Sequence, residues 1–509
     1  MRRTTSIATL TVALALTVTA CGSSSSSSGS IPPISSGTTT PPTTTVVSPT
    51  TAAPPSTTPS TIPSATTTTV VKATPKPVSS PCPAGAAADL ACFKVAVAVD
   101  PAAASPTLDL AVTVRRANPS AWNKPVLSIL GTTPTYPWTD AAAGNVFAGH
   151  DVIWVDQRGA GRSDGLTACP DLAKFPAEIQ TDNLGPDAVA AFKACFAKAN
   201  AASMPFASMF DHRIVATDID TVRRALGIDT WALYAGSAGA DIALQLVDIA
   251  PASVTALVTR TPTAVGAGVS TNNVADAFDR FTADCAAAPK CATAGDLHKV
   301  LTAAYARFAT PVTTKVLEDG TGVPIVLDRH TLLAGVQAIG NTAIAPNVPS
   351  ALTGGVDGTS DEFVARAFQS LPIDAFAWSF VARCQQKDYS NPGLTQTAND
   401  HAGIFAEYST KRFCDAVGPV PQYSARANPA STVPVLAVLP AYDPRGSVTT
   451  TKAIFAGFAH TTIVEVPRIV DPLSQLRDCF YTTANAFLSN PTAPLDATCL
   501  TAPAVSTLK

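Results

Sequence analysis

The sequence predicts an α/β fold built on a mostly parallel sheet flanked by helices. Short apolar runs alternate with segments of helical period after residue 150, which is the pattern of parallel strands joined by helices. The part of the chain that can fold, residues 81–509, is about 430 residues long, which suits one large α/β domain with an inserted subdomain.

The first 21 residues resemble a bacterial lipoprotein signal peptide. Arg2 and Arg3 give the positive start, residues 7–19 form an apolar stretch too short to span a bilayer, and the VTAC stretch ending at Cys21 is a lipobox. An ordinary signal peptide that happens to contain a cysteine is the alternative. On the lipoprotein hypothesis Cys21 carries the lipid, and the exported chain is anchored at the outer face of the cell membrane.

Residues 22–80 consist almost entirely of Ser, Thr, Pro, Gly and Val. This composition cannot bury enough apolar surface to offset its chain entropy, so a disordered linker is expected. The formal net charge of the whole chain is −3, with 14% charged residues. No basic stripe indicates nucleic acid as a partner, and no motif implies a metal or an organic cofactor.

Ten cysteines remain after Cys21. An even number in an exported chain indicates disulfides; metal binding is the alternative, but no Cys-x-x-Cys and no histidine at ligand spacing supports it. Spacing alone does not fix the connectivity. The ten cysteines fall into five pairs of neighbours along the chain, so sequential pairing is favoured: Cys82–Cys92, Cys169–Cys195, Cys285–Cys291, Cys384–Cys414 and Cys479–Cys499.

The elements of the core follow from apolar patterning and turn signals. Strands are expected at 93–99, 108–115, 125–130, 151–156, 231–234, 433–439 and 461–467. Helices are expected at 211–226, 238–249 and 472–488.

The most informative stretch is Ala235-Gly236-Ser237-Ala238-Gly239, which lies between an expected strand and an expected helix. This is the context of a nucleophile elbow, where a tight turn requires small neighbours and lifts the serine hydroxyl above the strand. The amide of Ala238 would then point at a developing oxyanion. Ser237 is therefore the candidate nucleophile.

Four stretches resemble the secreted proline iminopeptidase and tripeptidyl aminopeptidase (TAP-like) branch of the α/β hydrolases. They are Cys92-FKVAVAVD, DVIWVDQRGAGRSDG from Asp151, ATDIDTVRRALGIDTWALYAGSAG from Ala216, and VPVLAVLPAYDPRG from Val433. The resemblance covers the folded part nearly end to end. It implies an α/β-hydrolase core at 81–260 and 373–509, with a mainly helical cap at 261–372. The sequence agrees with a helical cap, because this interval shows little strand pattern and has helical apolar periods at 274–285, 297–308, 332–339 and 362–371.

The resemblance also implies site residues, because this fold orders its triad Ser, Asp, His along the chain. Ser237 fits the first position, and Asp443 fits the acid. The loop that supplies an oxyanion amide has become Leu130-Gly131-Thr132-Thr133-Pro134, where the amide of Thr132 remains available. A peptide or small acyl ligand is expected in a cleft between core and cap.

The third triad position departs from the pattern. The loop that should contain the histidine reads Arg468-Ile469-Val470-Asp471, and Asp471 aligns closest to it. A carboxylate there would be a weak base, because it does not titrate near neutral pH as imidazole does. Among the other histidines, His212 is of interest because it opens a helix whose start lies at the active-site edge.

Three hypotheses about function remain open on the sequence. The first is an exported serine hydrolase, an aminopeptidase-like peptidase or an esterase, with an unrecognised base. The second is a catalytically inactive pseudo-hydrolase, a lipid-anchored protein that binds a ligand. The third is a cell-surface domain that serves display or spacing alone, and no residue separates it from the second.

Overall fold

The computed structural model describes one of the chain's two units. The units are Met1–Val70 and Val71–Lys509, and all described residues belong to the second. They are residues 74–101, 106–117, 123–129, 147, 149–164, 170–175, 185–201, 211–236, 239–262, 271–288, 291, 294–316, 323–337, 347–358, 415, 427–469 and 471–502.

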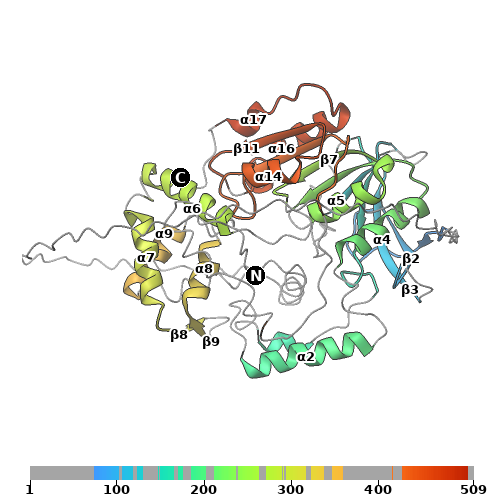
Figure 1. Cartoon of the computed structure of the whole chain (residues 1–509). Helices are drawn as coiled ribbons and strands as arrows, with labels where there is room; N and C mark the ends of the chain where they lie inside the picture. Colours follow the sequence, from blue (N-terminus) through green and yellow to red (C-terminus); the bar gives the residue numbers. More distant parts are fainter. Residues whose placement is uncertain are drawn as a thin grey trace, which may run out of the picture. The chain divides into compact units, whose positions relative to one another are not determined.

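A nine-stranded sheet with the order β1-β2-β3-β5-β4-β6-β7-β10-β11 forms the centre of this unit (Figure 1). The first three pairings of this order are antiparallel, and all pairings from β5 to β11 are parallel. The predicted mostly parallel sheet is thus confirmed. Its strands are β1 (Val78–Ser79), β2 (Leu90–Ala98), β3 (Thr107–Arg115), β4 (Val126–Ile129), β5 (Val152–Val155), β6 (Trp231–Gly236), β7 (Val254–Arg260), β10 (Val435–Pro440) and β11 (Thr461–Val466).

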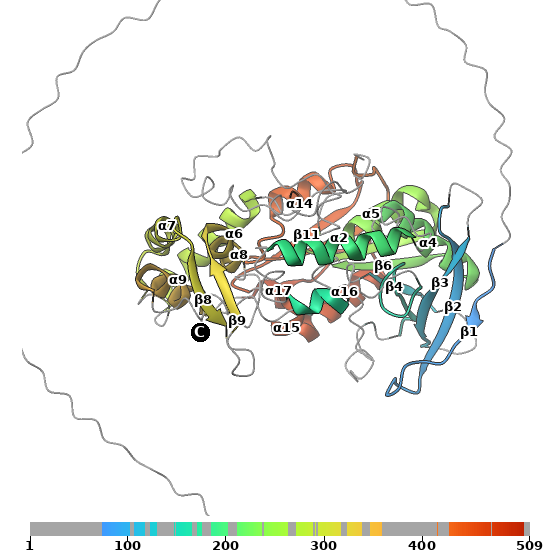
Figure 2. The same ribbon diagram turned by 90° about the horizontal axis from the view of Figure 1, so that it is seen from below.

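Helices cover both faces of the sheet, because its inner strands are apolar on both sides. On β6, Leu233 and Ala235 pack with α4 and α5, whereas Ala232 and Tyr234 pack with α16. Figure 2 shows α4 and α5 on one side of the sheet and α15, α16 and α17 on the other. The helices around the core are α2 (Pro186–Ala201), α4 (His212–Ala225), α5 (Gly239–Ile249), α14 (Val448–Ile454), α15 (Pro472–Gln475), α16 (Arg477–Ser489) and α17 (Thr498–Thr501), with short 3-10 turns η2 (Pro170–Lys174) and η3 (Pro251–Ser253).

A buried arginine ties α4 to the sheet. Arg158, in the VDQRGAGRS stretch, forms a bidentate pair with Asp218 of α4, with both N–O distances 2.7 Å. It also donates to the carbonyl groups of Ala98 and Val99, at 3.0 and 2.7 Å. Asp211 caps the same helix by accepting from the backbone N–H of Arg213. The cap thus fixes the start of α4, and the Arg158–Asp218 pair fixes its middle.

The interval assigned to the cap is mainly helical in its described part. It contains α6 (Thr271–Ala287), α7 (Leu297–Arg307), α8 (Arg329–Gln337) and α9 (Val348–Asp357). It also contains an antiparallel hairpin, β8 (Val312–Val316) with β9 (Val323–Leu327), so the expectation of little strand structure there was wrong. Both hairpin strands are rich in β-branched residues, which favour strands even in runs this short.

Two further expectations need correction. The helix predicted at 472–488 is interrupted at Leu476, whose backbone (φ −134°, ψ 37°) is not helical, and it forms α15 and α16 instead. β1 lies inside the last residues assigned to the linker, so the sheet begins slightly before the predicted boundary. The division into linker, core and cap otherwise stays a prediction, and the helix expected at 362–371 lies outside the described residues.

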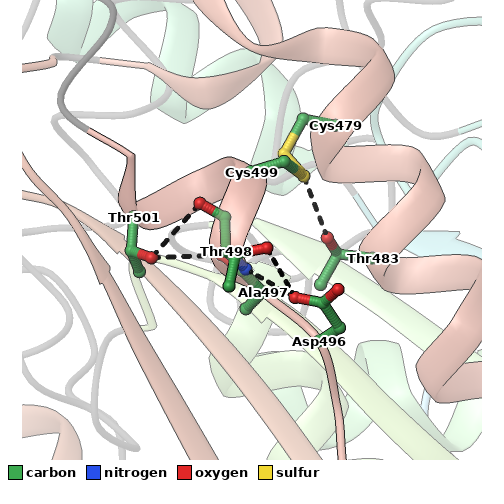
Figure 3. Close-up of a disulfide and its surroundings, with 7 residues drawn as sticks. All are labelled: Cys479, Thr483, Asp496, Ala497, Thr498, Cys499 and Thr501. Carbon is green, nitrogen blue, oxygen red and sulfur yellow. Dashed lines mark hydrogen bonds between the residues drawn. A yellow bond between two sulfur atoms is a disulfide. The ribbon is translucent and has the colours of Figure 1, made fainter.

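Three of the predicted disulfides are present: Cys82–Cys92, Cys285–Cys291 and Cys479–Cys499. Figure 3 shows the last of these joining α16 to α17, where Asp496 accepts hydrogen bonds from the backbone and side chain of Thr498. Cys195 is also disulfide-bonded. Its expected partner Cys169, and the pair Cys384–Cys414, lie outside the described residues.

Candidate functional site

The candidate site lies where the parallel strands end. β6 ends at Gly236 and α5 begins at Gly239, which is the strand–turn–helix context that the elbow requires. Ser237 and Ala238 lie outside the described residues, as do Thr132 and Cys21. In the pairing of β6 with β7, Gly236 stands opposite Arg260, so Arg260 marks the neighbourhood of the elbow.

Asp443 follows β10 and is 1% exposed. Its Oδ1 accepts hydrogen bonds from the backbone N–H and the Nε of Arg445, at 3.0 and 2.7 Å. Its Oδ2 accepts from Nη2 of Arg445 and from the hydroxyl of Thr261, the latter at 2.8 Å. Both carboxylate oxygens are therefore already engaged, by Arg445 and Thr261.

The charge state of Asp443 follows from these contacts. Burial alone would raise the pKa of this carboxyl, because it disfavours the charged form. The charge of Arg445, with the hydrogen bonds from Arg445 and Thr261, outweighs burial, and the pKa of Asp443 lies below its usual value. Asp443 is a firmly ionised counter-ion of Arg445.

Asp471, at the position expected for the histidine, is engaged as well. Its Oδ1 pairs with Nη1 of Arg260 and accepts the backbone N–H of Leu473 at 3.2 Å, which makes Asp471 the N-cap of α15. The charges of Asp471 and Asp443 both act on Arg260, and Asp471 also acts on Arg445. The two predicted carboxylates thus lie in one network with two arginines.

The backbone around this network is strained. Thr261 has a φ of 47° and Arg468 a φ of 60°, a region that non-glycine residues seldom occupy. Such residues persist where surrounding contacts determine them, and they cluster at functional sites. Thr261 is held by its hydrogen bond to Asp443, and Arg468 lies within 3.5 Å of Asp284 on α6.

Sequence reasoning missed both arginines. Arg445 follows Asp443-Pro444 directly and was visible in the YDPRG stretch, but its role depends on the loop folding back on its own aspartate. Arg260 is separated from Asp471 by 211 residues, so no local signal indicated that pair.

A buried histidine–carboxylate pair joins the start of α4 to the start of α5. Nδ1 of His212 is 2.6 Å from Oδ2 of Asp241, and both residues are buried. Asp241 also accepts from Nε2 of Gln245 at 3.4 Å, and Gln245 accepts in turn from Arg213 at 3.2 Å. Asp241 is four residues after Ser237, so this pair is near the elbow in the chain. The network around Asp443 comes near the elbow through Arg260, which stands opposite Gly236.

Among the described residues, no group of three or more His, Cys, Asp or Glu side chains is placed to bind a metal ion. Within the same part of the chain, no helix is both long enough and apolar enough to cross a membrane.

Comparison with known proteins agrees with this architecture. A family model described as the alpha/beta hydrolase fold matches residues 131–310. The fold is that of the α/β hydrolases. A search of curated proteins gave no match.

Solved structures of the same class resemble the chain at low identity. They include a proline iminopeptidase from Mycobacterium smegmatis, with 15% identity, 78% of this chain and 97% of that chain covered, and a TM-score of 0.32. A thermophilic esterase from Thermogutta terrifontis has 12% identity, coverage of 79% and 99%, and a TM-score of 0.35. An enol-lactonase from Burkholderia xenovorans has 10% identity, coverage of 75% and 97%, and a TM-score of 0.33.

Proposed function

We propose that this α/β-hydrolase-fold protein is an exported, lipid-anchored pseudo-hydrolase that binds a ligand and lacks the hydrolytic relay of its fold. The observation that carries the proposal is the pairing of both relay carboxylates with arginine. Asp443 is engaged by Arg445 and Thr261, and Asp471 by Arg260.

The chemistry of these pairs explains why they are inert. A triad acid must accept the Nδ1–H of a histidine, and the base must exchange a proton near neutral pH. Guanidinium donates hydrogen bonds, accepts none and does not lose its proton in proteins. Removing the base of a triad costs on the order of a millionfold in turnover, so a chain with this relay alone would not work as a peptidase.

Export and anchoring rest on the signal sequence and on the cysteines. The lipobox at Cys21 supports lipidation, and the three disulfides are of the kind that persists in oxidising compartments outside the cytosol. Metabolic labelling with a palmitate analogue tests this directly. Label that is incorporated in the wild type and lost in Cys21→Ala supports the anchor, whereas unlabelled membrane-free protein contradicts it.

The ligand that we propose is a peptide or a small acyl compound held between core and cap, as the resemblance to peptidases and esterases suggests. Extraction of purified protein into organic solvent, followed by mass spectrometry, tests for such a ligand. A compound of either class recovered at near-stoichiometric amount supports the proposal. Repeated recovery of none, from protein purified without detergent exchange, favours a display or spacing function.

Inactivity is tested with a fluorophosphonate probe that labels activated serines. We expect no labelling of folded wild-type protein above the level of Ser237→Ala. An active serine hydrolase in the same reaction serves as the positive control. Labelling that disappears in Ser237→Ala would refute the pseudo-hydrolase proposal.

A second candidate function is favoured by one observation, the buried His212–Asp241 pair. A histidine oriented by a carboxylate is what an activated serine requires, and this pair lies near the start of α5, the helix that follows Ser237. On this alternative the chain is a serine hydrolase, an aminopeptidase-like peptidase or an esterase, with a relocated base. Labelling of Ser237 that is lost in His212→Gln would select it.

A further inference from the structure

One face of α6 contacts the two loops that contain Asp443 and Asp471. The residues of α6 that make these contacts are Asn273, Arg280, Phe281 and Asp284, whose spacings of seven, eight and eleven positions put them on one side of a helix. Each reaches a residue between 441 and 445 or between 465 and 468. The helix therefore lies across both loops.

The loop after β10 receives most of these contacts. Arg280 donates from Nε to the carbonyl of Ala441 at 2.8 Å, and Asn273 donates to the carbonyl of Arg445 at 3.2 Å. Tyr442 is fully buried, and its ring meets that of Phe281 edge-on, with centroids 5.4 Å apart. This loop is thus held to α6 at both ends and in the middle.

The Tyr442 hydroxyl makes the shortest hydrogen bond between α6 and this loop. It donates to Oδ2 of Asp284 at 2.6 Å, and burial together with this bond raises the pKa of Tyr442, so the hydroxyl keeps its proton at physiological pH. The backbone N–H of Tyr442 donates to the carbonyl of Ile469 at 3.1 Å. Tyr442 therefore connects α6, its own loop and the loop after β11.

β11 and the loop after it are joined to α6 by two ion pairs. Arg468 is 3.5 Å from Oδ1 of Asp284, and Glu465 is 3.5 Å from Arg280. Asp284 thus contacts both loops, one through each carboxylate oxygen. The left-handed backbone of Arg468, which costs energy in isolation, has a partner that holds it.

The end of α6 that contains Asp284 is itself fixed. Cys285, the next residue, is bonded to Cys291, and both are buried. This bridge closes a loop of six residues at the end of the helix. Asp284 therefore lies in a helical turn that the disulfide constrains, and this end of α6 is less free to fray.

From these contacts we propose that α6 is a strap that opens and closes as one unit with the loops of Asp443 and Asp471, and that the Tyr442–Asp284 hydrogen bond is its latch. While the latch is formed, α6 holds the loops that contain Asp443 and Asp471 in place, and with them the arginine–carboxylate network. The strap goes beyond the proposed binding function and does not depend on it, since the same strap would act on a catalytic or an inert site.

Hydrogen exchange measured by mass spectrometry on the full mature chain, with disulfides intact, tests the strap. The variants are Tyr442→Phe, which keeps the ring, and Asp284→Asn. We expect amides of 271–287, 441–446 and 465–471 to exchange about 10-fold to 100-fold faster in both variants, the range expected for a lost hydrogen bond to a charged group. Asp284→Asn also loses the ion pair with Arg468, so it should have the larger effect. Adding Tyr442→Phe to it should change exchange less than Tyr442→Phe does in the wild type, because the bond in question is already weakened.

Asp279→Asn is the matched control, because Asp279 is on the same helix but pairs with His298 of α7, within the cap. In this variant we expect faster exchange in α7 and little change in α6 or in the loops of Asp443 and Asp471, because every contact between α6 and these loops remains. The proposal is wrong if Tyr442→Phe and Asp284→Asn fold, as circular dichroism would show, and yet leave exchange of the core loops unchanged. It is equally wrong if the control opens those loops to the same extent.

Discussion

Asp443 and Asp241 are both buried carboxylates near the elbow of this α/β-hydrolase fold, but their partners differ in kind. Asp443 pairs with an arginine, and Asp241 with a histidine. Arginine stays protonated at any pH that a folded protein experiences, whereas a histidine accepts and releases protons near neutrality. The first pair therefore contains no group that exchanges a proton near neutral pH, whereas the second contains an imidazole.

The largest effect on activity should come from giving Asp443 a histidine partner in place of Arg445, like the partner that Asp241 has. In Asp471→His alone we expect no gain in hydrolysis of p-nitrophenyl acetate, because Arg445 still occupies Asp443. Adding Arg445→Val frees the acid, and a gain of about 100-fold is expected. This is the low end for general base catalysis, because the charge of Arg260 nearby disfavours an imidazolium.

Two outcomes would contradict this view of the relay. A gain in Asp471→His alone, as large as in the double variant, would mean that Arg445 does not block Asp443. A gain that survives addition of Ser237→Ala would mean that the hydrolysis takes place elsewhere.

The next effect is on stability. Arg445→Met leaves the carboxylate of Asp443, 1% exposed, without its counter-ion, and we expect the free energy of unfolding to fall by about 3 kcal/mol. This value is at the low end for a broken buried pair, because the Arg445 side chain is 37% exposed. Urea unfolding at pH 7 measures the loss. Adding Asp443→Asn should recover most of it; if the double variant is as unstable as the single one, packing rather than charge dominates.

We expect a smaller loss in the free energy of unfolding when the His212–Asp241 pair is broken. His212→Leu removes the donor to Oδ2 of Asp241, but Gln245 still donates to Oδ1, so we expect a loss of about 2 kcal/mol in the same experiment. Gln245→Leu provides the comparison, with a loss below about 1 kcal/mol, because its bond to Asp241 is long at 3.4 Å. A loss in His212→Leu as large as in Arg445→Met would remove the distinction between the two regions.

The parallel core could be predicted from sequence because its strands are buried on both faces and appear as short apolar runs. The start of α4 could be predicted as well, because Asp211 is a capping residue at the start of a helical pattern. The order of elements, with the family resemblance, placed Asp443 and Asp471 after the last two strands of the sheet, where β10 and β11 end; their roles stay predictions. Their partners could not be predicted, because the Arg260–Asp471 pair depends on how distant loops meet. The interruption of the last helix at Leu476 also had no composition signal.

The smallest expected effect is on the pH dependence of stability, and it concerns the Asp443–Arg445 pair. The pKa of Asp443 lies below the usual value of an aspartate, because the charge and hydrogen bonds of Arg445 outweigh burial. Its contribution to stability is therefore present above the usual aspartate pKa and is lost as pH falls through the lower folded pKa. Below about pH 4, the free energy of unfolding of the wild type should therefore fall more steeply with pH than that of Asp443→Asn, by at most about 1.4 kcal/mol per pH unit for this one proton. Urea unfolding at intervals from pH 5 to pH 2 measures the two slopes. Parallel curves would mean that Arg445 does not hold Asp443 in its charged form, and the arginine pairing would then no longer explain the loss of the relay.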